Sequence, residues 1–153
     1  MKTKSSKTIK VLIALDYDPT AQKIAEIGFS LAKAMGAEII LLHVLVDLFY
    51  YFVPYLDMGS LQLESTDKLK NISKQFLDKT KQHLGDETIQ TIVKEGDFAG
   101  TIISTANEMH VDIIVMGSHS RKWLENIVMG SVTEKVLHQA QIPLLIIPTK
   151  KRH

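Results

Sequence analysis

Five short apolar runs, separated by stretches of helical periodicity, restrict the fold of this chain more than any other feature. Four of the runs are apolar along most of their length, as expected of strands buried on both faces of a parallel sheet. The third alternates, which indicates a strand with one wetter face. The runs occupy residues 9–15, 38–46, 88–93, 111–116 and 144–147.

Helices are predicted between these runs, at residues 19–35, 60–84, 98–109 and 132–139. Asp18 before Pro19, and Asp97 before the third helix, are typical N-caps, and Gly36 and Gly85 are typical of the residue after a helix. The first helix carries an apolar stripe that is predicted to face the sheet, formed by Ile24, Ile27, Leu31 and Met35.

The alternation of strands and helices implies parallel strands joined by helical crossovers. We therefore expect an α/β fold of the Rossmann-like class, a doubly wound five-stranded parallel sheet with helices on both faces. The length of 153 residues suits a single domain, with residues 1–7 and 149–153 as flexible tails.

Charge and composition narrow the classes of partner. A net charge of +1 gives no electrostatic support for nucleic acid or an anionic membrane as the main partner. The chain has no cysteine, which excludes disulfides, thiolate metal sites and cysteine nucleophiles. The apolar run at 11–15 is too short for a signal-peptide core, and no run approaches the length of a membrane helix, so a cytoplasmic location is expected.

The candidate site lies where two loops meet. In a doubly wound sheet, ligands bind at the carboxyl ends of strands where the winding reverses, which brings together Asp16 and the segment from Met116 to Ser120. Gly130 and Ser131 directly precede the last helix, whose N-terminus suits phosphate oxygens. The local pattern is equally compatible with a turn glycine at Gly117 and an ordinary N-cap at Ser131.

Motifs of enzymes and metal sites are missing from the sequence. No glycine precedes a lysine as in a Walker loop, and neither G-x-G-x-x-G nor G-x-S-x-G occurs. The histidines include no pair with metal-ligand spacing. His43 lies in an apolar run and is interpreted as a hydrogen-bonded core residue, whereas His119 is placed to contact a phosphate. We identify no catalytic residue and no metal ligand.

Residues 47–59 (DLFYYFVPYLDMG) form the least regular part of the chain. Such an apolar segment is expected to pack against the domain, because a loop of this kind is rarely left exposed. A lid over a ligand is the alternative, and the role of the segment stays open.

The segment around the candidate site resembles the signature of the universal stress protein family. Gly117-Ser118-His119-Ser120, nine residues, and then Gly130-Ser131 are similar to the G-x2-G-x9-G-(S/T) of its nucleotide-binding members. The flanking sequences DIIVMGSHS and SVTEKVLHQAQIPLLIIP agree, as does the first part of the chain, IKVLIALDYDPTAQKIAEIGFSLAKAMGAEIILLHV. The resemblance covers nearly the whole chain and is weakest at 47–88.

The resemblance implies a five-stranded parallel sheet and ATP or another adenine nucleotide as ligand, with Mg²⁺ as a candidate companion. Asp16 would meet the ribose or adenine, and Val44 would line the adenine pocket. Met116 and Gly117 would lie against the ribose and first phosphates, and Gly130, Ser131 and Val132 would cradle the phosphates. A homodimer through Leu144–Ile147 is also implied, and an uncovered apolar edge strand would favour aggregation.

The sequence departs from the signature at Ser120, which occupies the position of the second glycine. If the backbone there needs a positive φ, serine costs about 1–2 kcal/mol, which corresponds to about tenfold in affinity. If φ is negative, the hydroxyl adds a phosphate donor.

The leading hypothesis is a dimeric ATP-binding sensor or regulator of a stress response, whose protein partner the sequence does not name. One alternative is a dimeric interaction module of the same family with a weakened or lost nucleotide site. The other is a slow ATPase or self-phosphorylating enzyme, which ranks last because no general base is identifiable.

Overall fold

The computed structural model describes residues 7–45, 59–118 and 131–149, with the backbone alone for 59–66. In chain order the elements are β1 (Lys10–Ala14), α1 (Ala21–Ala34), β2 (Glu38–Leu45), α3 (Gly59–Leu84), β3 (Gln90–Glu95), α4 (Phe98–Glu108), β4 (Ile113–Gly117), α5 (Ser131–Gln139) and β5 (Leu144–Ile147). Residues 47–58 of the predicted loop lie outside the described residues. The same holds for residues 1–6 and 150–153 of the two predicted tails.

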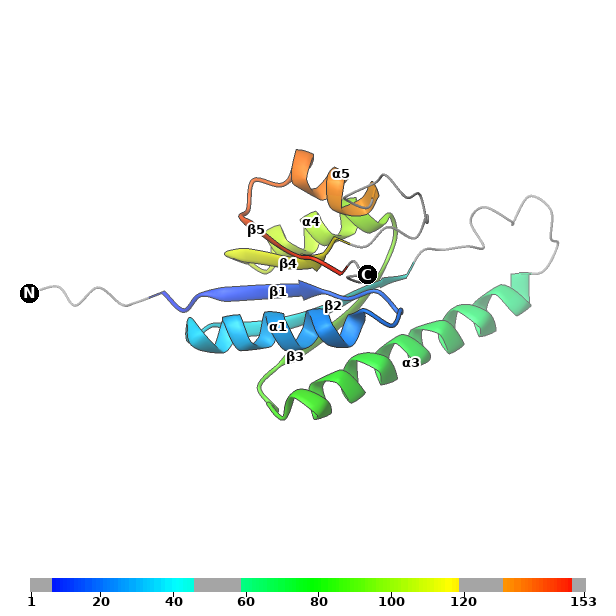
Figure 1. The fold of residues 1–153 in the computed structure, drawn as a ribbon. Coiled ribbons are helices and arrows are strands. Elements are labelled where there is room, and N and C mark those ends of the chain that lie inside the picture. Colours follow the sequence, from blue (N-terminus) through cyan, green and yellow to red (C-terminus); the bar gives the residue numbers. More distant parts are fainter. Residues whose placement is uncertain (1–6, 46–58, 119–130, 150–153) are drawn as a thin grey trace, which may run out of the picture.

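The five strands form one parallel sheet in the order β3-β2-β1-β4-β5. Helices α1 and α3 cover one face of the sheet, and α4 and α5 cover the other (Figure 1). The predicted α/β class, with its doubly wound five-stranded sheet, is confirmed. Because β2 and β3 lie on one side of β1 while β4 and β5 lie on the other, the winding reverses between β1 and β4.

The core consists of two buried clusters, one on each face of the sheet. Ile13 and Val115 pack with the residues of α1 and α3, whereas Leu12 and Ile114 pack with those of α4 and α5. All four side chains are at most 1% exposed. Burial on both faces explains why the sequence of these strands is almost continuously apolar.

Helix α1 packs on the sheet through small residues. Its buried positions are Ala21, Ile24, Ala25, Gly28 and Ala32. A β-carbon on Gly28 would lie 2.9 Å from the Ile13 side chain, so the helix axis comes unusually close to the strands. The larger apolar side chains therefore lie on a flank of the helix.

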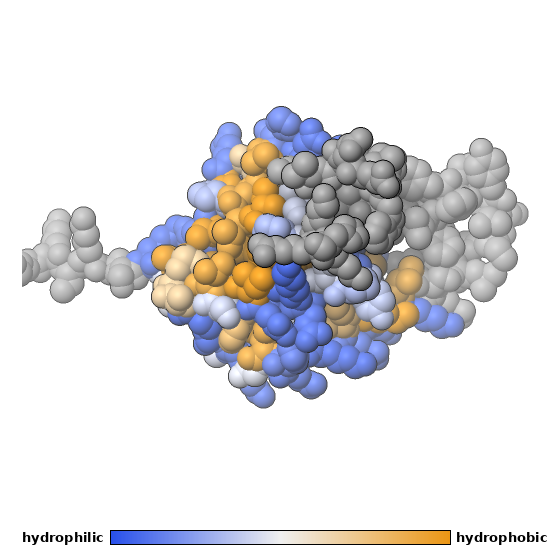
Figure 2. All heavy atoms as spheres, in the orientation of Figure 1, coloured by the Kyte–Doolittle hydropathy of each residue, from blue (hydrophilic) through white to orange (hydrophobic). Residues whose placement is uncertain are grey.

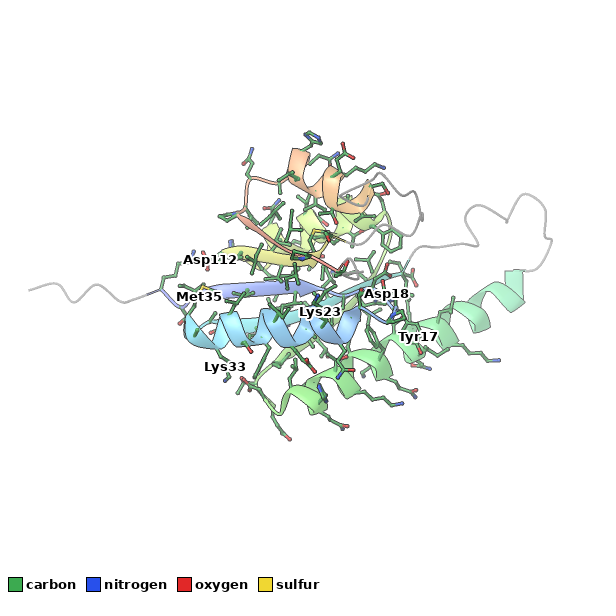
Figure 3. The ribbon with its side chains drawn as sticks, viewed as in Figure 1. Tyr17, Asp18, Lys23, Lys33, Met35 and Asp112 are labelled. Carbon is green, nitrogen blue, oxygen red and sulfur yellow. The ribbon has the colours of Figure 1, made fainter. Side chains whose placement is uncertain are left out.

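The predicted apolar stripe of α1 does not face the sheet as a whole. Ile27, Leu31 and Met35 are 36%, 41% and 39% exposed, and of the predicted stripe only Ile24 faces the sheet. Lys23, one turn before Ile27, donates from Nζ to the Pro148 carbonyl at 3.0 Å. Figure 3 shows Lys23 on α1. This contact places the exposed flank of α1 on the side of β5.

The helix ends follow the predicted signals in three of four cases. Gly36 and Gly85 have φ values of +64° and +72°, and the Asp97 carboxylate accepts from the Gly100 N–H at 2.9 Å. Asp18 is not the N-cap of α1, which begins at Ala21 after Thr20. Its carboxylate instead accepts from the Thr20 N–H at 2.7 Å, which forms an Asx-turn before the helix.

None of the helices in the described ranges combines the length and the apolar character needed to cross a membrane.

Candidate functional site

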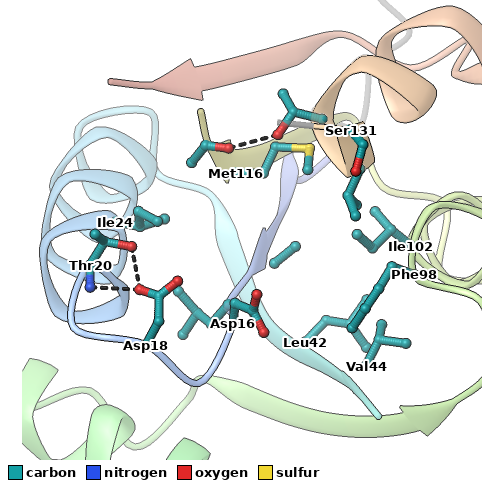
Figure 4. A pocket seen from close by; sticks show the side chains of 15 residues that line it. Asp16, Asp18, Thr20, Ile24, Leu42, Val44, Phe98, Ile102, Met116 and Ser131 are labelled. Atoms are coloured by element: carbon teal, nitrogen blue, oxygen red, sulfur yellow. Dashed lines mark hydrogen bonds between the residues drawn. The ribbon is translucent and has the colours of Figure 1, made fainter. Parts of the chain in front are cut away.

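A cavity of about 310 Å³ opens at the carboxyl ends of β1 and β4, where the winding of the sheet reverses (Figure 4). A volume of this size lies within the range of small-molecule sites. The lining residues are Ala14, Leu15, Asp16, Asp18, Thr20, Ile24, Leu42, Val44, Phe98, Ile102, Met116, Gly117, Ser131, Val132 and Thr133.

One side of the cavity is an apolar slot between β2 and α4. Leu42 and Val44 face it from β2, because alternate residues of a strand share one face. Phe98 and Ile102 face it from the first turns of α4, and Figure 4 shows these side chains side by side. Asp97 fixes the start of α4 and thereby the place of the Phe98 ring. A slot of this kind suits a flat, weakly polar ring system.

The opposite side is the first turn of α5. Ser131, Val132 and Thr133 line the cavity there, and the N–H groups in the first turn of a helix have no partner within the helix. The partial positive charge at the N-terminus favours an anion. None of the described lining residues is basic, so backbone groups would supply the attraction for a phosphate.

Asp16 and Asp18 bound the cavity beside β1. The Asp16 carboxylate accepts from the Tyr17 N–H at 3.1 Å, and Asp16 is half-buried. Carboxylate oxygens are acceptors for hydroxyl groups, which suits the diol of a ribose. The described residues bring together no group of three histidine or acidic side chains that could hold a metal ion.

The structure brings six of the predicted site residues together around this one cavity. They are Asp16, Val44, Met116, Gly117, Ser131 and Val132. His119, Ser120 and Gly130 lie outside the described residues. His43 is buried and its Nδ1 lies 2.8 Å from the Leu15 carbonyl, a partner that can only accept, so the interpretation as a hydrogen-bonded core histidine is confirmed.

Sequence reasoning missed Leu42, Phe98, Ile102 and Thr133. The strand period of two would have added Leu42 to Val44, and the spacing of four on a capped helix would have paired Phe98 with Ile102. Thr133 carried no local signal, because its partner, Gly117, is 16 residues away in the sequence.

The model of the universal stress protein family matches residues 8–148. The chain belongs to this family. Universal stress protein MJ0531 of Methanocaldococcus jannaschii is 32% identical over 146 residues, which cover 94% of this chain and 84% of that protein. Universal stress protein YxiE of Bacillus subtilis is 28% identical over 150 residues, covering 90% of this chain and 97% of the relative.

Solved structures of universal stress proteins share the fold. The structure of MJ0577 has a TM-score of 0.78 and 28% identity, covering 95% of this chain and all of the other. A universal stress protein in complex with cAMP has a TM-score of 0.65 and 16% identity, covering 94% of this chain and 100% of the other. At that identity the likeness shows the fold alone.

Proposed function

We propose that this universal stress protein binds an adenine nucleotide in the cavity between β1 and β4 and acts as a homodimeric sensor or regulator in a stress response. One observation carries the proposal: a single cavity joins an apolar slot to the N-terminus of a helix. A nucleotide has the same two parts, a flat base and an anionic phosphate chain. The cAMP complex of a family member supports the same class of ligand.

The base is assigned to the slot formed by Val44, Phe98 and Ile102. Backbone groups of β2 at Val44 would read the edge of the base, and the Phe98 ring would cover its face. Asp16 would accept hydrogen bonds from the ribose hydroxyls. This orientation points the phosphates toward α5.

The phosphates are assigned to Gly117 and to the first turn of α5 at Ser131 and Val132. Met116, buried beneath them, supports the ribose end. Gly130, Ser120 and His119 remain predicted contacts outside the described residues. ATP with Mg²⁺ is the first ligand to test, and the metal would neutralise part of the triphosphate charge.

Isothermal titration of the purified chain with ATP and Mg²⁺ tests the proposal. We expect saturable binding of one nucleotide per chain, weakened about tenfold by Phe98→Ala, which removes the cover of the base. Leu137→Ala is the matched control, because Leu137 is 48% exposed on α5 and does not line the cavity. Absence of saturable heat into the millimolar range would rule the proposal out.

The homodimer is assigned to the free edge of β5. The side chains of Leu144, Leu145 and Ile146 are half-buried although each is fully apolar, and β5 pairs only with β4 among the described strands. Ile27 and Leu31 on the exposed flank of α1 extend this surface. Figure 2 shows apolar residues gathered over β5. A second copy that pairs with β5 would cover them.

A further inference from the structure

Thr133 makes a hydrogen bond between two elements that line the candidate phosphate site. Its hydroxyl donates to the Gly117 carbonyl at 2.8 Å. Thr133 is only 2% exposed, and its side chain also lines the cavity. The bond therefore lies in the wall of the site and is shielded from water, where a hydrogen bond is least weakened by competition.

The bond joins the two elements that would hold the phosphates. Gly117 ends β4, and Thr133 is the third residue of α5, so the contact spans 16 positions in the sequence. The distance between the strand end and the helix N-terminus is thus fixed directly by a side chain. Without it, that distance would depend on the connecting chain.

Gly117 is also held from the other side. The Ser118 N–H donates to the Ile147 carbonyl at 2.9 Å, and the Thr149 N–H donates to the Ser118 hydroxyl at 3.1 Å. These two bonds continue the pairing of β4 with β5 beyond the last strand residue. Since the strand end is anchored to β5, the Thr133 bond sets the position of α5 relative to a rigid support.

The carbonyl that Thr133 engages matters electrostatically. A carbonyl oxygen repels a phosphate, whereas N–H groups attract it. The Thr133 hydroxyl donates to the Gly117 carbonyl oxygen and thereby offsets its partial negative charge. The partial positive charges of the first-turn N–H groups of α5 then dominate at the site. Position and charge both favour a phosphate.

We propose that Thr133 is a positioning residue for the phosphate groups of the nucleotide, acting through Gly117 and the N-terminus of α5. The inference rests on the proposed function, because it assigns the phosphates to this end of the cavity. It adds that the affinity for the phosphates, and not for the nucleoside, depends on the Thr133 hydroxyl.

Thr105 on α4 provides a matched control. It is also a buried threonine, 1% exposed, but its hydroxyl has no hydrogen-bond partner among the residues that the structure describes. Thr105→Val therefore makes the same chemical change in the same layer of helices without breaking a bond. It should leave nucleotide affinity unchanged and thermal stability unchanged or higher.

The test compares the dissociation constants of ATP and adenosine for each variant by titration. We expect Thr133→Val to weaken ATP binding about tenfold, because the N-terminus of α5 is no longer held beside the phosphates, and to leave adenosine affinity within about twofold of the wild type. Thr133→Ser keeps the hydroxyl and should retain the wild-type ratio of ATP to adenosine affinity. Thr105→Val should match the wild type for both ligands.

The outcomes separate the two claims. If the wild type binds neither ligand, the proposed function fails and this inference fails with it. If the wild type binds both, an unchanged ATP affinity in Thr133→Val, or an equal loss for ATP and adenosine, overturns the positioning role alone. Should Thr133→Val not fold, Thr133→Ala, which also removes the hydroxyl, is compared with Thr133→Ser: a loss of affinity confined to ATP in Thr133→Ala supports the role, and equal ATP affinities of the two variants overturn it.

Discussion

Gly117 and Ile24 pack so closely that a β-carbon on Gly117 would overlap the terminal methyl group of Ile24. The Thr149 side chain lies close on another side, 3.1 Å from the same position. The glycine that ends β4 is therefore required by the packing of α1, whatever it does for a ligand. Ile24 is 4% exposed and lines the cavity, so this contact also shapes the site.

We predict that Gly117→Ala lowers the free energy of unfolding by about 1–3 kcal/mol, because Ile24 must leave its preferred position. Ile24→Val removes the overlapping methyl group and should cost about 0.5–1.5 kcal/mol alone. In the double variant, Ile24→Val should restore most of the free energy of unfolding that Gly117→Ala removes. Chemical denaturation of the four proteins of this cycle measures the coupling, and simple additivity of the two losses would contradict the packing described.

A charge at the start of α5 should separate folding from binding. Ser131→Asp places a carboxylate at the helix N-terminus, which stabilises the helix by about 0.3–1 kcal/mol. The same charge repels a phosphate, so we expect ATP affinity to fall at least about tenfold. Ser131→Ala, which removes only the hydroxyl, should lose less. Equal ATP affinity in Ser131→Asp and the wild type would place the phosphates elsewhere.

The edge of β5 should carry the dimer. Ile146 belongs to neither buried cluster, so Ile146→Lys introduces a charge at the edge with little damage to the core. Light scattering coupled to gel filtration should then report a dimer for the wild type and a monomer for Ile146→Lys. Ile72→Lys on α3, at a residue 50% exposed, is the control and should leave the mass unchanged. A dimeric Ile146→Lys protein would exclude β5 as the interface.

His110 follows α4 with a φ of +55°, the one positive value at a non-glycine residue in the described part of the chain. This conformation costs a side chain about 1–2 kcal/mol, and glycine loses about 0.5–1 kcal/mol more entropy on folding. We therefore expect His110→Gly to raise the free energy of unfolding by about 0.5–1 kcal/mol. His110→Ala keeps the strain and should give no gain. Both are measured by urea denaturation.

Stability should fall in acid through Asp86. Its carboxylate accepts from Lys33 at 2.7 Å and from the Thr88 N–H at 2.9 Å, and these bonds hold the pKa of Asp86 well below its usual range. Because the pKa is lower in the folded state, the unfolded chain binds the extra proton first. The contribution is complete above about pH 4, the ordinary value for aspartate, and is lost as the pH falls below it.

The melting temperature should accordingly fall as the pH is lowered below about 4, and Asp86→Asn should flatten that dependence. Lys33→Met removes the ammonium group that pairs with Asp86 and should flatten the pH dependence in part. The two substitutions together should flatten it no more than Asp86→Asn alone. A pH dependence that is unchanged in Asp86→Asn would show that other carboxyl groups control acid unfolding.

The sequence predicts the strands and the meeting of Asp16 with Gly117 because both depend on local patterns. Apolar runs fix the strands, and the reversal of winding fixes which strand ends are neighbours. The face of α1 could not be predicted in the same way. An apolar stripe and a stripe of small residues run side by side on that helix, and only contact of Gly28 with Ile13 selects the second.

The site was predictable where a motif marks it and was missed where tertiary contacts build it. Gly117 and Ser131 stand in the signature, whereas Phe98 enters the cavity because Asp97 caps α4 at that point. The bond between Thr133 and Gly117 depends on the placement of α5 against β4. Such a contact has no local pattern in the sequence.

Amide chemical shifts of the isotope-labelled chain, followed during titration with ATP and Mg²⁺, report which residues the nucleotide contacts. Binding between β1 and β4 predicts that the largest changes occur at Asp16, Val44, Gly117 and the first turn of α5. Amides near His83 and Lys33, whose side chains pair with Glu26 and Asp86 and do not line the cavity, should change little. Changes concentrated on α3, or no changes into the millimolar range, would contradict a nucleotide site in this cavity.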